Sequence, residues 1–225
     1  MGTRATRETL PLPPQVKEGA LTSGDLLALM GEEDFAEAEA EGLSFTGQDA
    51  SYVSGRGVEM RGCAFSGCSL RGARLKGVSF TDVVFQNCDF SNAKLQELYM
   101  QRVRFIGCKL VGTDMVEARL RNVVMEDCVL RMVNLTGSKL DTVRLLSCDA
   151  AEAALQMISE LKRVTLTDCD LTRAELMNTR LSGLDLTTCR IDGLMVTGAL
   201  ELRGAIVTPM QALSLSTLLG IRIKE

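Results

Sequence analysis

Histidine and tryptophan are absent from this chain of 225 residues, and only two tyrosines and four prolines occur. A chain without histidine lacks the usual general base near neutral pH, the usual nitrogen ligand of zinc and one member of a serine or cysteine triad. No run approaches the roughly 18 apolar residues of a membrane span, and the N-terminus has no apolar signal-peptide core. We therefore expect a cytoplasmic protein that is no enzyme, needs no cofactor and contacts no membrane.

Glycine, by contrast, occurs 20 times and cysteine eight times, and both follow a repeat of five residues. From Leu43 the chain reads LSFTG, QDASY, VSGRG, VEMRG, CAFSG and keeps this frame to Met157; after one extra residue, Ile158, the frame resumes and ends at Gly198. The centre of each of the 31 units is almost always Leu, Phe or Met, and the residue two before it is small or apolar. Neither a helical period nor strict alternation produces this pattern. Each unit therefore forms one side of a coil, and Gly, Asn and Asp at the unit ends favour turns.

The cysteines indicate how many sides make one coil. Seven of them recur every 20 residues, with one interval of 21 across Ile158, and they are Cys68, Cys88, Cys108, Cys128, Cys148, Cys169 and Cys189. Four units therefore form one coil, and these cysteines form an inward ladder. The same spacing predicts two further inward columns, one of Phe65, Phe85, Phe105 and Met125 and one of Leu75, Leu95, Met115 and Leu135.

A cysteine ladder invites metal or redox chemistry, but the predicted geometry favours a structural role. A tetrahedral thiolate site needs four converging sulfurs, whereas a straight column gives each cysteine only two neighbours, about 4.8 Å away. Buried thiols in an apolar interior also have raised pKa values and low reactivity. Ser138 and Ser159 are assigned to inward positions as well, and no base accompanies them.

Two irregularities are expected in the wall of the coil. Ala150 stands in a column that otherwise holds larger apolar residues, which predicts a thin or distorted wall there. The extra residue Ile158 predicts a bulge at Met157–Glu160. The organisation that follows is an N-terminal extension and cap at 1–42, repeats at 43–198 and a C-terminal module at 199–225.

Both ends carry helix signals. A short helix is expected at Leu26–Met30, followed by the acidic run from Glu32. Thr208 is a candidate N-cap with Pro209 at the first helical position, Met210 to Leu219 is mostly apolar, and Gly220 is a natural residue after the C-cap. This C-terminal helix has more apolar surface than one solenoid end covers, so we expect a two-fold homodimer through it; a cap that only seals its own coil is the alternative. The expected interface residues are Met210, Leu213, Leu215, Leu218 and Leu219.

Outward residues predict two surfaces of interest. One side of the coil carries eight basic residues against four acidic ones, while the net charge of the chain is −4. That mild charge predicts no direct nucleic-acid binding. A neighbouring side exposes apolar residues at outward positions, a possible partner surface, and they are Val84, Ile106, Val124 and Leu146. A merely solvated, uneven surface explains the charges equally well.

The repeat resembles that of pentapeptide-repeat proteins, whose unit is of the A(D/N)LxG type, and the resemblance covers roughly residues 43–198. It implies an all-β solenoid, a right-handed quadrilateral β-helix of about eight coils with a short N-terminal cap and a C-terminal helix. At ~4.8 Å per coil such a rod is about 37 Å long.

The ends resemble one branch of that family. The segments from Leu202 to Val207, Gln211-Ala212 and Leu218 to Ile223 are similar to the tail of Qnr and MfpA proteins, and the LPLPP start is similar to Gram-positive chromosomal Qnr-like proteins. This resemblance implies a dimeric DNA mimic that binds DNA gyrase or topoisomerase IV and lessens quinolone action. Two departures stand against it: the coils are nearly neutral, and the only interruption of the repeat is one residue. An interaction scaffold for an unrelated protein partner is the alternative.

Overall fold

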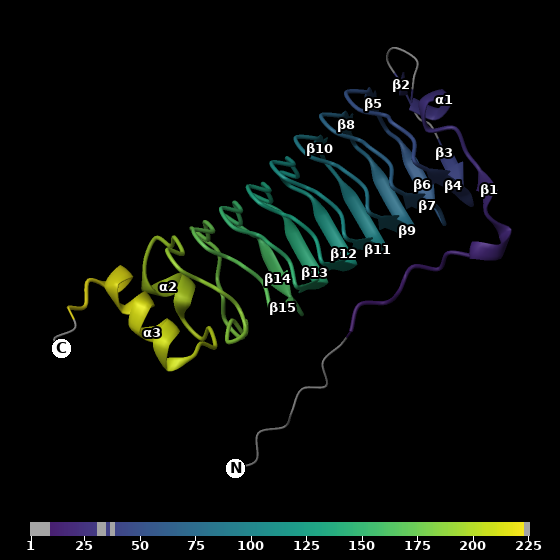
Figure 1. Ribbon diagram of the computed structural model, residues 1–225. Helices are drawn as coiled ribbons and strands as arrows, with labels where there is room; N and C mark the ends of the chain where they lie inside the picture. Colours follow the sequence, from purple (N-terminus) through teal and green to yellow (C-terminus); the bar gives the residue numbers. More distant parts are fainter. Residues whose placement is uncertain (1–9, 31–34, 37–38, 223–225) are drawn as a thin grey trace.

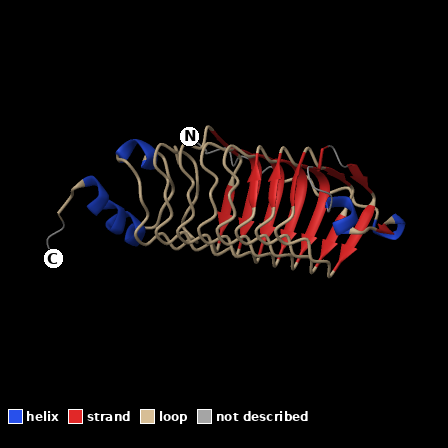
Figure 2. Cartoon of the chain, turned by 90° about the horizontal axis from the view of Figure 1, so that it is seen from above, coloured by secondary structure: helices blue, strands red, loops and turns tan. Residues whose placement is uncertain are grey.

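A parallel β-solenoid of about seven turns, followed by a short helical part, forms the protein (Figure 1, Figure 2). The computed structural model describes residues 10–30, 35–36 and 39–222. Its strands pair in parallel into one sheet of eleven strands and one of four. In chain order the elements are η1 (Glu18–Ala20), β1 (Thr22–Ser23), α1 (Leu26–Met30), β2 (Phe35–Ala36), β3 (Glu39–Glu41), β4 (Leu43–Thr46), β5 (Ser54–Arg56), β6 (Glu59–Arg61), β7 (Ala64–Ser66), β8 (Arg74–Lys76), β9 (Ser79–Gln86), β10 (Lys94–Gln96), β11 (Tyr99–Ile106), β12 (Arg119–Glu126), β13 (Lys139–Leu146), β14 (Glu160–Lys162), β15 (Thr165–Thr167), α2 (Ala199–Leu202), α3 (Pro209–Ser216) and η2 (Thr217–Leu219).

Strand register confirms that four units make one coil. From β9 to β13 every pair joins residues 20 apart, so that Val83 faces Val103 and Val103 faces Val123. The inward phenylalanines stack accordingly: the ring centroids of Phe65 and Phe85 are 4.7 Å apart, and those of Phe85 and Phe105 are 4.8 Å apart. These distances equal the inter-strand spacing of an ordinary sheet, as expected when backbone hydrogen bonds join successive coils.

A left-handed backbone conformation closes almost every unit and turns the chain into the next side. Positive φ values recur every five residues, at glycines such as Gly47 (61°) and also at Asn87 (52°) and Asp127 (53°). Glycine, asparagine and aspartate tolerate this conformation best, which confirms their predicted role. Arg102 and Thr142 adopt it too, because the coil imposes the turn whatever residue ends the unit.

The few polar groups that point into the coil are satisfied by backbone carbonyls of the preceding coil. The Thr113 hydroxyl donates to the Phe90 carbonyl at 2.9 Å, and the Ser138 hydroxyl donates to the Met115 carbonyl at 3.1 Å. Thiols use the same arrangement, since Cys108 donates to the Phe85 carbonyl at 3.5 Å. A small donor two residues before the unit centre is therefore compatible with burial.

The extra residue of the repeat lies where the sequence places it, but its side chain takes an unexpected position. Lys139 of β13 pairs with Glu160 of β14, an offset of 21, so the insertion lies before β14. Ile158 is buried and lines the interior, whereas Ser159 is exposed. The expected inward position of Ser159 is therefore wrong. Burying an isoleucine removes more apolar surface from water than burying a serine, and the added residue lets the chain make that exchange.

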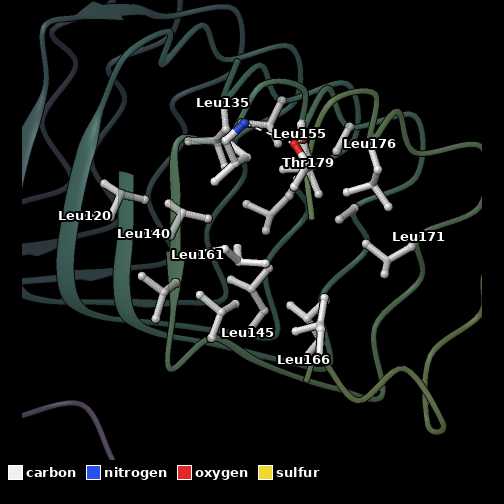
Figure 3. A pocket seen from close by; sticks show the side chains of 18 of the residues that line it. Leu120, Leu135, Leu140, Leu145, Leu155, Leu161, Leu166, Leu171, Leu176 and Thr179 are labelled. Carbon is white, nitrogen blue, oxygen red and sulfur yellow. Dashed lines mark hydrogen bonds between the residues drawn. The ribbon is translucent and has the colours of Figure 1, made fainter. Parts of the chain in front are cut away.

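Beyond the phenylalanine stack the interior is incompletely filled. Phenylalanines fill the first coils, but the later coils hold leucine, valine and alanine, and a cavity of about 50 Å³ lies among them (Figure 3). Ala150 and Ala153 line it, together with Leu130 and Leu171 above and below Ala150. The thin wall expected at Ala150 corresponds to this cavity. Its one polar side chain, Thr179, donates to the Leu155 carbonyl at 2.6 Å and accepts from the Ile158 N–H at 3.0 Å.

One glutamine secures the N-terminal end of the rod. The Gln48 side chain accepts a hydrogen bond from the Leu26 N–H of α1 at 2.6 Å and donates to the Gly24 carbonyl at 2.8 Å. Leu26 is completely buried and plugs the first coil. A side chain at Gly24 would collide with the ring of Phe45. Helix α1 lies where it was predicted, and the acidic run from Glu32 to Asp34 lies outside the described residues.

A second glutamine secures the C-terminal end. The Gln211 amide of α3 donates to the carbonyls of Leu186 and Cys189 at 2.7 and 2.8 Å, and its oxygen accepts from the Thr208 N–H at 2.8 Å. Thr208 caps α3 and Pro209 occupies its first turn, as predicted. Coil-type backbone pairing also continues outside residues 43–198, for example between β3 and β6 and between Asp185 and Ile206.

Candidate interaction surfaces

The cysteine ladder lies entirely inside the rod. All eight cysteines are buried and free. Burial raises the pKa of Cys63, and a hydrogen bond with Cys148 together with burial raises the pKa of Cys169 to about 11. These two thiols are therefore protonated at neutral pH, and a protonated thiol is a poor nucleophile and metal ligand.

Within residues 10–30, 35–36 and 39–222, no cluster of histidine, cysteine, aspartate or glutamate has the arrangement of a metal site. Ser138 is completely buried with its hydroxyl bonded to a carbonyl. No helix in the described part of the chain is long and apolar enough to cross a membrane. The candidate functional sites of the described residues therefore lie on the surface of the rod.

The C-terminal end carries the most concentrated apolar surface. Seven of the thirteen exposed large hydrophobic side chains in the described residues lie between Met195 and Ile221. Among the predicted interface residues, Met210 is 71% exposed, Leu213 45% and Leu218 42%. Leu215 instead points back into its own coil and is 7% exposed, so it plugs this end as Leu26 plugs the other. The side chain of Leu219 lies outside what the structure describes.

The predicted apolar partner surface is interrupted by charged and polar residues. In one outward row Val84, Arg104 and Val124 follow each other up the rod. In the next row Ile106 and Leu146 are separated by Glu126. Arg104 and Glu126 form an ion pair of 2.6 Å across the two rows. Each of the four predicted residues is only partly exposed, and they are Val84, Ile106, Val124 and Leu146. Apolar and charged residues therefore alternate on this side and form no continuous apolar patch.

Ion pairing engages half of the basic residues that the sequence places on the neighbouring side and leaves the excess of four. Each of its four acids pairs with a base, and the pairs are Arg61–Glu59, Arg102–Asp82, Lys162–Glu160 and Arg163–Asp141. Of the eight bases, those without an ion pair among the described residues are Arg119, Arg121, Lys139 and Arg180. Arg119 and Lys139 face each other on β12 and β13, and Arg121 follows on β12. These three exposed residues, the basic cluster, give this side a local positive charge.

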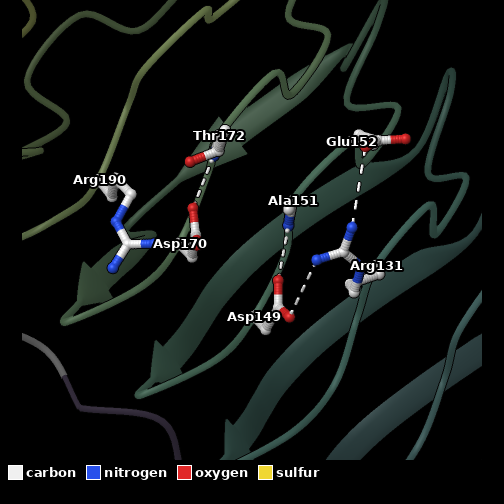
Figure 4. Close-up of polar contacts among 7 residues, drawn as sticks. All are labelled: Arg131, Asp149, Ala151, Glu152, Asp170, Thr172 and Arg190. Carbon is white, nitrogen blue, oxygen red and sulfur yellow. Dashed lines mark hydrogen bonds and ion pairs between the residues drawn. The ribbon is translucent and has the colours of Figure 1, made fainter.

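Acidic residues on the cysteine-ladder side are also engaged (Figure 4). Asp149 accepts from the Ala151 N–H at 3.2 Å and lies 3.6 Å from Arg131, which also approaches Glu152 at 3.8 Å. Asp170 one coil later accepts from the Thr172 N–H at 2.9 Å and pairs with Arg190 at 2.9 Å. These carboxylates cap turns and neutralise arginines, so they present little unbalanced negative charge.

A four-sided parallel solenoid built from units of five residues, with no catalytic constellation in its described part, defines the class of this molecule. Sequence comparison agrees with it. A model described as "Pentapeptide repeat region" matches residues 78–155, and one described as "Pentapeptide repeats (8 copies)" matches 59–96 and 159–193. Together they cover more than half of the chain, and neither describes a catalytic family. The chain belongs to the pentapeptide-repeat proteins.

Solved structures similar to this chain have low sequence identity and TM-scores below 0.5. HetL, a pentapeptide-repeat protein involved in heterocyst differentiation regulation in the cyanobacterium Nostoc sp. strain PCC 7120, is 15% identical, with a TM-score of 0.45 over 80% of this chain and 90% of its own. A trypsin-treated form of QnrB1, a plasmid-mediated fluoroquinolone resistance protein, is 19% identical, with a TM-score of 0.36 over 85% and 93%. No curated protein sequence matches the chain.

Proposed function

We propose that this protein is a non-enzymatic binding protein that docks on DNA gyrase or topoisomerase IV in the cytoplasm and lessens the action of quinolones. The observation that carries the proposal is the C-terminal end, where a tail sequence similar to that of Qnr and MfpA proteins coincides with the most concentrated apolar surface. In that branch the tail helix joins two rods end to end.

An end-to-end dimer is the first consequence of the proposal. Met210, Leu213 and Leu218 present apolar side chains that their own coil does not cover. Soluble monomers seldom expose such concentrated apolar surface. A two-fold mate would cover each patch with the same patch of the other chain, which is the usual arrangement of a symmetric dimer.

The dimensions of such a dimer suit a surface that holds duplex DNA. About seven turns of ~4.8 Å give a rod of roughly 34 Å. Two rods joined at their C-terminal ends span about 68 Å, the length of about 20 base pairs. Because acids such as Asp149 and Asp170 are already engaged, contact would rest on shape more than on charge. We therefore expect binding to depend on salt less steeply than the binding of DNA does.

The test is gyrase supercoiling and cleavage in the presence of ciprofloxacin. We expect the wild-type chain to reduce quinolone-stabilised cleavage, and Leu213→Glu, which places a charge in the apolar patch, to lose this effect. The matched control is Leu27→Glu, at an equally exposed leucine on the opposite end, and it should protect as the wild type does. A wild-type protein that neither protects nor inhibits gyrase or topoisomerase IV would refute the proposal.

The basic cluster favours a second candidate function. Arg119, Arg121 and Lys139 form a local positive surface in a chain of net charge −4. A scaffold for an unrelated protein partner with an acidic surface would use it. Replacing Arg119 and Lys139 by glutamate should abolish capture of such a partner, while protection against ciprofloxacin stays unchanged.

A further inference from the structure

The proline-rich arm at residues 10–17 is held on the rod by two backbone hydrogen bonds. The Leu12 N–H donates to the Asn122 side-chain oxygen at 3.1 Å, and the Gln15 N–H donates to Asp82 Oδ1 at 2.9 Å. The acceptors lie 110 and 67 residues further along the chain. In Figure 1 the arm is the dark segment that leads past the rod into η1 and β1.

The two acceptors belong to one edge of the rod. Asp82, Arg102 and Asn122 end corresponding units of three successive coils, each with a left-handed backbone, and strand pairing skips them. Arg102 donates to both carboxylate oxygens of Asp82 at 2.6 Å, and these side chains are 19% and 15% exposed. The hydrogen bonds from Arg102 and from the Gln15 N–H hold the pKa of Asp82 below its usual value. The edge therefore presents two fixed acceptors, Asp82 and Asn122, two coils apart.

The spacing of these acceptors matches an extended proline-rich chain. Asp82 and Asn122 are two coils apart, about 9.6 Å at the inter-strand spacing. Polyproline II helix has three residues per turn and rises about 9.3 Å per turn. Donors three residues apart, such as the N–H groups of Leu12 and Gln15, thus reach acceptors two coils apart without distorting either partner. A β-strand, which rises about 10 Å in three residues, would turn successive N–H groups to opposite sides.

Burial between residues 11 and 14 fits this spacing of three. Pro11 and Pro14, three residues apart, are partly buried, whereas Leu12 and Pro13 between them are exposed. Prolines at 11, 13 and 14 have no N–H group, so no donor is left unpaired against the rod at these positions. Proline also limits the entropy lost when the segment docks.

We propose that the edge formed by Asp82, Arg102 and Asn122 is a binding site for extended proline-rich peptides, and that residues 10–15 of the same chain are its resident, displaceable ligand. The arm occupies the site in the described state, and a proline-rich segment of a partner competes for it. This site is independent of gyrase binding.

The test uses the full-length chain with Leu12→Pro and Gln15→Pro, which removes the two donors but keeps the arm proline-rich. A fluorescent peptide of residues 10–18, LPLPPQVKE, is titrated against this variant and against the wild type. We expect saturable binding to the variant and at least fivefold weaker binding to the wild type, because the tethered arm competes at an effective concentration on the order of 1 mM. The same peptide with proline at both donor positions should not bind.

Two further variants test whether the peptide binds at the edge formed by Asp82, Arg102 and Asn122. Asn122→Gly in the Leu12→Pro, Gln15→Pro background keeps the left-handed turn but removes an acceptor, and it should weaken peptide binding at least fivefold. Asn92→Gly, the same exchange at a unit end on another edge, should leave binding unchanged. Absence of saturable binding to the Leu12→Pro, Gln15→Pro chain, or equal binding after Asn122→Gly, would overturn the proposal.

Discussion

At the scale of single residues, the unit-end position decides how much strain each coil carries. Eighteen non-glycine residues in the described part of the chain have positive φ values, and most are Asn, Asp, Glu or Arg. Thr142 is the least suited of them, with φ of 59°, because a β-branched side chain is rarely found there. Its hydroxyl donates to Asp141 at 3.0 Å and accepts from Arg163 Nε at 2.8 Å, which offsets part of the strain.

We predict that Thr142→Asn stabilises the rod by about 0.5–1 kcal/mol, because asparagine tolerates the left-handed conformation and keeps an acceptor for Arg163. Urea unfolding measures the change. The reciprocal exchange, Asn178→Thr at φ of 59° on an exposed unit end, should destabilise by about 1 kcal/mol. Equal stabilities for all three proteins would contradict this account of the turn.

The ladder thiols predict a loss of stability at high pH. The folded pKa of Cys169 is raised to about 11 from 9.0. The stabilisation of its neutral form is present below pH 9 and is lost as the pH rises through 11, because unfolded thiols ionise first. Between pH 8 and pH 10.5 the wild type should lose about 1–2 kcal/mol relative to Cys169→Val, which has one titrating thiol fewer. If the unfolding free energies of both proteins fall by the same amount as the pH rises, the prediction is refuted.

At the scale of elements, each end of the solenoid is closed by a leucine plug and a glutamine. Leu26 and Leu215 cover the interior, while Gln48 and Gln211 bond the backbone groups that the last coils leave without a neighbouring coil. The carboxamide of each glutamine supplies a donor and an acceptor together at its end of the rod.

Replacing Gln211 by glutamate tests this closure. Gln211→Glu keeps the acceptor for Thr208 but turns a carboxylate towards the carbonyls of Leu186 and Cys189. We expect a loss of about 2–4 kcal/mol in unfolding free energy at pH 7, and a smaller loss at pH 4, where protonation restores a donor. Gln96→Glu on exposed β10 is the control and should change stability little. A loss independent of pH would contradict the prediction.

At the scale of the whole molecule, the filling of the interior changes along the rod. Phenylalanines fill the N-terminal coils, and the cavity of about 50 Å³ lies among the aliphatic residues that follow. We predict that Ala150→Leu stabilises the rod by about 1–2 kcal/mol, since it fills this cavity in line with Leu130 and Leu171. Ala93→Leu is the matched control in a fully packed coil away from the cavity, and it should destabilise by about 1–3 kcal/mol. Thermal and urea unfolding of both variants measure the effects.

The apolar C-terminal end predicts assembly. We expect the wild type to sediment as a dimer at micromolar concentration and Leu213→Glu as a folded monomer, because Leu213 is exposed in the single chain. Leu215→Glu should instead unfold the C-terminal end, since Leu215 is buried in its own coil. Leu27→Glu at the opposite end should remain dimeric. Wild-type protein that sediments as a monomer would exclude the proposed dimer.

The coil, its four sides and its stacked columns could all be predicted from the amino-acid sequence. A solenoid repeats the same environment at every turn, so the residues that fill it recur at a fixed interval, and the cysteine spacing and the Phe65, Phe85 and Phe105 column record that interval directly. The capping residues of α3 could also be predicted from the sequence, because capping is a contact between residues that are close in the chain.

Which of two residues with the same pattern faces the interior became clear only from the folded rod. Ile158 rather than Ser159 turned inward because its burial removes more apolar surface from water, and Leu215 turned back to plug its own coil. Salt bridges engaged four of the eight basic residues of one side, and the proline-rich arm found acceptors 67 and 110 residues away. The arm shares no period and no proximity in the chain with its two acceptors, so this contact exists only once the rod has formed.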